Sequence, residues 1–183
     1  MSLAQREWAT RILRSWFGEL GPDDWFGGSQ AVDTMLAQRF ARDWCRLRFR
    51  QPADFVIDPA TALGAIILFD QIPRNLFRGT ADAFATDPLA LALTHAALER
   101  GWHRGLGRDQ IQFLAMPLMH SEDRSDQRRC VEIFGRHVPG ALSFARSHKA
   151  MIDRFGRFPH RNEVLGRKTT AAEQRAIDAG FSW

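Results

Sequence analysis

Three polar segments of the chain each follow an apolar stretch and hold side chains that can bind or react. They occupy residues 70–78, 120–123 and 157–167. Helix ends leave backbone donors and acceptors unsatisfied, and polar side chains gathered at such ends often line a cleft. We therefore expect the three segments to meet at one site.

Two arginine–asparagine pairs, Arg74-Asn75 and Arg161-Asn162, are the main binding candidates. A guanidinium group donates paired hydrogen bonds that suit a carboxylate or phosphate, and an amide adds direction. In a purely structural alternative, Arg74 pairs with Asp70 one helical turn earlier and the asparagines cap helices. The candidate ligand-binding residues are Gln71, Arg74, Asn75, Arg78, Arg157, Arg161 and Asn162.

The same segments contain histidines and carboxylates suited to proton transfer. An enzyme would use Asp70 or Glu122 as general base and His120 or His160 as general acid, and these four are the candidate catalytic residues. His120, Glu122 and Asp123 lack the spacing of a helical zinc motif, so no metal site is predicted. No cofactor is predicted either, since phosphate loops, dinucleotide fingerprints and nucleophile elbows do not occur.

The four remaining histidines fit structural roles. His148 and His95 lie in apolar helical patterns, which favours hydrogen-bonded core positions. His103 and His137 fit surface positions at helix ends.

The elements that must position these segments are helices. Ser29 is suited to cap a helix that carries Val32, Leu36 and Phe40 on one stripe. Asp58-Pro59 and Asp87-Pro88 each fit an N-cap followed by proline at the first helical position. Ser121 is expected to open a further helix. The apolar patterns predict helices at about 59–70, 88–100, 108–119 and 141–155, the first three of them central because they are apolar nearly all round.

Composition agrees with this assignment. The 183 residues are 45% hydrophobic and include no tyrosine, and strand-favouring residues are sparse. Short connections between helices favour antiparallel hairpins. We expect residues 1–183 to form one all-α domain, a helical-hairpin array of seven to eight helices.

Two patterns bear on the environment of the chain. Cys45 and Cys130 show no paired spacing, and we expect both to be reduced and buried. The apolar runs are too short to span a membrane, and no signal peptide pattern occurs. These observations predict a cytoplasmic protein without a membrane partner.

The net charge of +4 comes from arginine, because Lys149 and Lys168 are the only lysines. Solvated salt bridges and an anion-binding surface are both consistent with this excess. Basic residues near Phe155 and Phe158 also leave nucleic-acid binding open as a third choice; they are Arg154, Arg157, Arg161, Arg167 and Lys168.

Four motifs in series resemble the bacterial domain-of-unknown-function family 924. They are WFG at 16–18, LFDQIPRNLFRG at 68–79, MPLMHSED at 116–123 and RFGRFPHRN at 154–162. The resemblance covers essentially the whole chain. It implies an all-α fold similar to tetratricopeptide-like superhelices, assigns no activity, and marks the motif positions as candidates for a shared site.

Two functions are preferred to nucleic-acid binding. The favoured one is a binding module whose groove presents Arg74, Asn75, His120, Arg161 and Asn162 to an anionic peptide end or small molecule. The alternative is an enzyme that acts on a phosphorylated or carboxylated metabolite, with acid–base catalysis by a histidine and a carboxylate.

Overall fold

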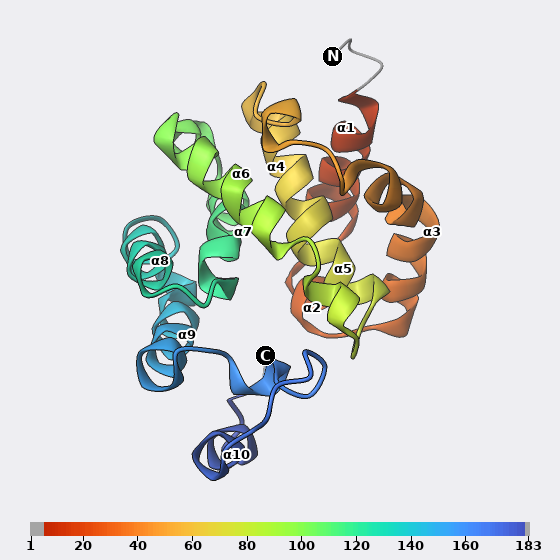
Figure 1. Ribbon diagram of the computed structural model, residues 1–183. Helices are drawn as coiled ribbons and strands as arrows, with labels where there is room; N and C mark the ends of the chain where they lie inside the picture. Colours follow the sequence, from red (N-terminus) through yellow and green to blue (C-terminus); the bar gives the residue numbers. More distant parts are fainter. Residues whose placement is uncertain (1–5, 182–183) are drawn as a thin grey trace.

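The computed structural model describes residues 6–181, and every regular element in that range is helical (Figure 1). This confirms the predicted all-α class. The α-helices are α1 (Glu7–Arg14), α2 (Pro22–Phe26), α3 (Gln30–Leu47), α4 (Pro59–Ile66), α5 (Ile72–Leu76), α6 (Asp87–Glu99), α7 (Arg108–His120), α8 (Arg124–His137), α9 (Leu142–Phe155) and α10 (Ala171–Asp178). The short π and 3-10 segments are η2 (Ser15–Glu19), η3 (Pro52–Asp54), η4 (Ile67–Gln71), η5 (Ala81–Phe84), η6 (Trp102–Gly105), η7 (Pro139–Ala141) and η8 (Pro159–Arg161).

The helices pack in a continuous series of neighbours. Helix α4 contacts α1 and α6, and the series continues from α6 through α7 and α8 to α9. Figure 1 shows α1 to α5 on one side of the molecule and α8 and α9 on the other, with α6 and α7 between them. After α9 the chain turns back below the end of α7 before α10. The C-terminal segment therefore approaches helices that are distant in the sequence.

The main core surrounds α4 and α7, as their apolar sequences predict. All residues from Thr61 to Ile66 are buried, and in α7 the side chains from Phe113 to Met119 are buried as well. Helix α6 differs from the prediction because it buries only one face, and Leu89 and Leu91 are partly exposed.

The helix predicted at 59–70 is divided into two parts, α4 and the π-helical segment η4, and α5 follows from Ile72. Pro73 is the physical reason for the break. Proline has no N–H, so it cannot donate to the carbonyl of Phe69 four residues earlier. The Thr86 hydroxyl donates to that carbonyl instead, over 2.6 Å. Within η4, Asp70 and Gln71 are buried, so the break positions polar side chains in the interior.

The helix starts confirm one predicted cap and correct two. Asp58 caps α4 by accepting a 2.7 Å hydrogen bond from the Thr61 N–H. The prediction for Asp87 was wrong, because Thr86 is the N-cap residue of α6 and Asp87 is its first helical residue. Ser121 ends α7 rather than opening α8, and Asp123 caps α8.

Cys130 is buried as predicted, but Cys45 is exposed, because it lies off the buried stripe of α3. Among the helices of residues 6–181, none is long and apolar enough to cross a membrane.

Candidate functional site

The C-terminal end of α7 meets the π-helical segment η4 through a hydrogen bond between His120 and Asp70. Nδ1 of His120 lies 2.7 Å from Oδ1 of Asp70, and the Asp70 side chain is fully buried. Burial raises the pKa of Asp70, but the interactions with His120 and Arg74 outweigh it, and the pKa lies below its usual value. Gln71 also donates to this carboxylate. Asp70 is therefore an ionised acceptor that holds the imidazole ring.

Arg74 and Arg161 approach the same carboxylate, that of Asp87. The Arg74 guanidinium lies 2.8 Å from the Asp87 carboxylate and 3.8 Å from Asp70, and Nη1 of Arg161 lies 3.5 Å from Asp87. Burial raises the pKa of Asp87, and the attraction of Arg74 does not fully offset this effect. Two guanidinium groups thus converge on one partly buried anion.

Arg161 is itself buried, with 7% of its surface exposed. Its guanidinium carbon lies 4.7 Å from the ring centre of Phe84 and 4.6 Å from that of Phe158, and Nη1 donates to the His120 carbonyl over 3.1 Å. Nε has no hydrogen-bond partner among the described residues. Burial lowers the pKa of Arg161 to about 10, so the group keeps its charge at neutral pH.

Two further histidines lie near this cluster. The ring of His148 is 6.5 Å from that of His120, and its Nδ1 lies 2.8 Å from the Phe144 carbonyl, which agrees with a buried structural histidine. Burial lowers the pKa of His148 to about 3 and that of His160 to about 4. Both imidazoles are therefore neutral at pH 7, which makes His160 a weaker general acid than expected.

Other predicted site residues bind different partners. Asn75 donates to Asp33 over 2.7 Å, and Arg78 donates three hydrogen bonds to the same carboxylate. These contacts join α5 to α3. The Asn162 side chain is fully buried, and its amide nitrogen lies 3.3 Å from the Thr169 hydroxyl.

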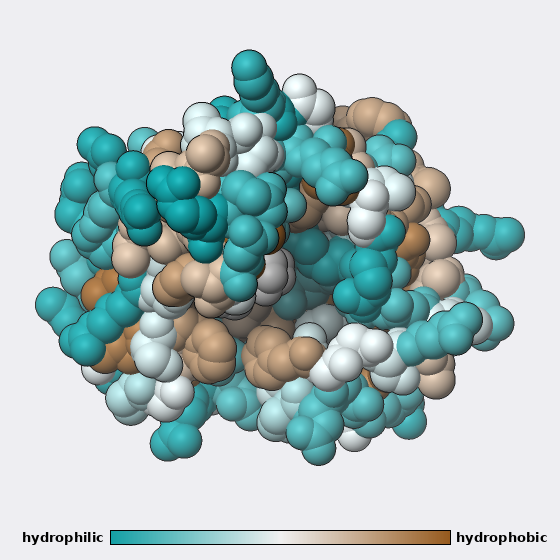
Figure 2. All heavy atoms as spheres, turned by 90° about the horizontal axis from the view of Figure 1, so that it is seen from below, coloured by the Kyte–Doolittle hydropathy of each residue, from teal (hydrophilic) through white to brown (hydrophobic). Residues whose placement is uncertain are grey.

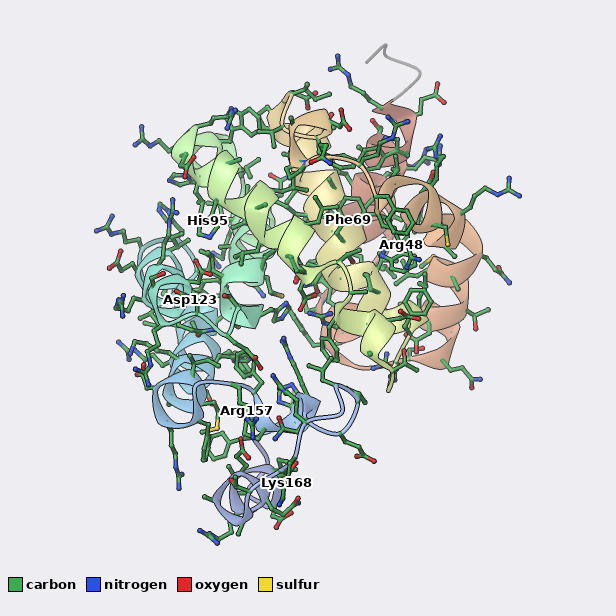
Figure 3. The ribbon with its side chains drawn as sticks, viewed as in Figure 1. Arg48, Phe69, His95, Asp123, Arg157 and Lys168 are labelled. Carbon is green, nitrogen blue, oxygen red and sulfur yellow. The ribbon has the colours of Figure 1, made fainter. Side chains whose placement is uncertain are left out.

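Glu122 and Arg157 hold the C-terminal segment in position. Arg167 donates to both Glu122 oxygens over 2.8 and 3.1 Å, and the Phe158 N–H adds a bond of 2.7 Å. Burial raises the pKa of Glu122, but these bonds outweigh it and the pKa is lowered, which does not suit a general base. Arg157 binds Glu173 and donates to the Lys168 carbonyl over 2.9 Å (Figure 3). Arg157 and Arg167 are thus already neutralised, which weakens the nucleic-acid alternative.

Sequence reasoning missed Asp87 and Phe84 as members of the site. The Asp87-Pro88 pair fits a helix cap so well that it concealed the contact with two arginines. Phe84 carries no sequence signal, because its importance comes from lying 4.5 Å from the Arg74 guanidinium and near that of Arg161.

Figure 2 shows the molecule from below, the side on which the C-terminal segment and α10 lie in Figure 1. This face is hollowed near its centre, and hydrophilic side chains line much of the hollow. Solvent and small polar molecules can therefore enter a recess on this face.

Comparisons with known proteins find matches that cover nearly the whole chain. A family model described as "Bacterial protein of unknown function (DUF924)" matches residues 12–180. A solved structure, "Structure of Protein of Unknown Function ATU0120 from Agrobacterium tumefaciens", is 35% identical with a TM-score of 0.88, and the alignment covers 94% of this chain and 97% of that one. Among curated proteins there is no match. The chain therefore belongs to the bacterial family DUF924, as its four motifs predict.

Proposed function

We propose that the chain is an enzyme that binds a small phosphorylated or carboxylated molecule beside His120 and uses this histidine as its acid–base group. The observation that carries the proposal is the buried Asp70–His120 hydrogen bond with two guanidinium groups next to it. Proton-transfer and anion-binding groups are thus combined in one cluster. An anion-binding module would not need the oriented histidine.

The Asp70 carboxylate defines the tautomer of His120. An ionised carboxylate only accepts hydrogen bonds, so Nδ1 of His120 carries the proton that it shares with Asp70. Nε2 is then the basic nitrogen and can take a proton from a substrate. The His120 side chain is 17% exposed, which leaves part of the ring accessible.

Arg74 and Arg161 would hold the anionic group of the substrate. The guanidinium carbon of each arginine lies within 4.7 Å of the ring centre of Phe84, and this contact limits the movement of the two guanidinium groups. The unpaired Nε of Arg161 supplies a further donor at a buried position. A carboxylate or phosphate that replaced Asp87 on these groups would lie near the imidazole.

We also propose that the helices form a tetratricopeptide-like superhelix. Successive contacts between α7, α8 and α9 support a hairpin array, and such arrays carry ligands on a concave face. The hollowed face in Figure 2 also supports the second candidate function, capture of a carboxylate-ended peptide by the same arginines. This alternative requires binding without turnover.

A thermal-shift and activity screen tests the proposal. The purified protein is mixed with phosphorylated metabolites, small carboxylic acids and carboxylate-ended peptides. A ligand at a hundred times its Kd adds about 2.7 kcal/mol to the free energy of unfolding, a readily measured shift in Tm. We expect Arg161→Ala to abolish the shift, and Arg146→Ala, at an exposed position on α9, to preserve it.

The His120→Gln variant separates the two functions. We expect it to retain ligand binding and to lose turnover of the identified ligand by about 100-fold or more. Equal turnover in His120→Gln would reject the enzyme. A screen in which only peptides stabilise the protein would favour the binding module, and no stabilisation by any small anion would contradict both roles of the arginines.

A further inference from the structure

We infer that a second site, between the end of α6, η6 and α8, binds a small phosphorylated molecule. A cavity of about 180 Å³ opens there, with room for about six water molecules at 30 Å³ each. A phosphoryl group on a short carbon chain fits this volume. The lining residues are Leu98, His103, Arg129, Glu132, Ile133, Arg136 and His137.

The polar lining of this cavity is strongly basic. Two guanidinium and two imidazole groups face one carboxylate, that of Glu132. Among the described residues, Arg129 and Arg136 form no salt bridge, whereas many arginines elsewhere pair with acids. Guanidinium groups that lack a protein anion are suited to phosphate oxygens, which accept paired hydrogen bonds.

A hydrogen-bonded series holds Arg129 in place. Nη1 of Arg129 lies 3.0 Å from Nδ1 of His95, and Nε2 of His95 lies 2.9 Å from Asp126. Figure 3 shows His95 between α6 and α8. Since Nδ1 of His95 accepts from Arg129, its Nε2–H donates to Asp126, so Arg129 is held by a ring nitrogen and not by a carboxylate.

His103 supplies the buried part of the site. Its ring centre lies 5.6 Å from that of His137, and its Nδ1 is buried without a hydrogen-bond partner among the described residues. A buried nitrogen without a partner is costly, and a phosphate oxygen would relieve that cost. Burial lowers the pKa of His103, and the charges of His137, Arg104 and Arg129 lower it further.

A cation is a poor fit for the same cavity. The residues from 6 to 181 contain no group of three or more histidine, cysteine, aspartate or glutamate side chains arranged to hold a metal ion. The site is also separate from the one near His120. Asp87 begins α6 and Leu98 lies near its end, which places about 17 Å of helix between them at 1.5 Å per residue.

The test is a titration of the full chain with inorganic phosphate at constant ionic strength, followed by the imidazole NMR signals of His103 and His137. We expect saturable shifts and a higher titration midpoint for His103 in the presence of phosphate, because a bound anion favours the protonated imidazole. Besides these imidazoles, the charged groups facing the site are Arg104, Arg129, Arg136 and Glu132. Acetate should produce much weaker shifts.

Matched variants identify the residues responsible. Arg129→Ala and Arg136→Ala should each weaken phosphate binding about tenfold, since each removes a charge-assisted contact. Arg128→Ala, exposed on the same helix but outside the cavity, should leave it unchanged. Circular dichroism checks that each variant remains folded. Linear shifts without saturation, an equal loss in Arg128→Ala, or binding of a single-stranded oligonucleotide but not of phosphate would overturn the inference.

Discussion

Nδ1 of His120 lies 2.7 Å from Oδ1 of Asp70, although 50 residues separate them in the sequence. The carboxylate is fully buried and also faces Arg74 at 3.8 Å. A buried carboxylate needs such partners, because an isolated charge in the interior is strongly unfavourable. The packing of η4 against α7 therefore determines which nitrogen of His120 carries the proton.

Asp70→Asn tests this relationship without knowledge of a substrate. The amide can donate to Nδ1 of His120, so we expect the histidine proton to move from Nδ1 to Nε2. The two tautomers are distinguished by ¹⁵N NMR of the imidazole. A variant in which Nδ1 stays protonated would show that Asp70 does not determine the tautomer. If the proton moves to Nε2, turnover of any substrate should fall by about 100-fold or more, as in His120→Gln.

The sequence predicted the helices well because their signals are local. The Asp58 cap and the apolar runs of α4 and α7 depend on residues within a few positions of one another. The break at residues 67–71 was missed, since it depends on Pro73 together with a hydroxyl from Thr86. A contact between separate elements leaves no periodic signal in the sequence.

The candidate site was predicted in part for the same reason. Polar residues at helix ends correctly indicated that Asp70, Arg74, His120 and Arg161 lie together. Residue type could not show that Asn75 binds Asp33, 42 positions earlier. Such partner choices depend on how α5 packs on α3, which is a property of the folded chain.

Arg74 and Arg161 both pair with Asp87, so in the proposed function this carboxylate competes with an anionic ligand for the two guanidinium groups. We expect Asp87→Asn to bind phosphate or a small carboxylate about tenfold more tightly than the unmodified protein, measured by calorimetry. Asp109→Asn, exposed in the first turn of α7, is the matched control. Weaker binding in Asp87→Asn would instead mean that Asp87 orients the arginines.

Glu173 should make folding sensitive to acid. The hydrogen bond from Arg157 lowers the pKa of Glu173 to about 2, from an ordinary value of 4.5. A lowered pKa in the folded state stabilises the protein above pH 4.5, and this contribution disappears as pH falls towards 2. Urea unfolding across pH 2–7 should therefore show a smaller pH dependence in Glu173→Gln. Glu163→Gln, which changes an exposed carboxylate, should retain the original dependence.

Gly64 and Gly135 offer opposite outcomes for the same substitution. A Cβ atom at Gly64 would lie 2.9 Å from the Ala9 side chain and 3.0 Å from its backbone, where α4 packs against α1. We expect Gly64→Ala to lower the free energy of unfolding by about 1–3 kcal/mol, since a tightly packed core does not accept an added methyl group. At Gly135 in α8 the nearest atom would be 3.9 Å away, an ordinary contact. Gly135→Ala should therefore stabilise the helix by about 0.5–1 kcal/mol. Urea denaturation measures both values, and destabilisation of equal size in the two variants would contradict the close approach of α1 and α4.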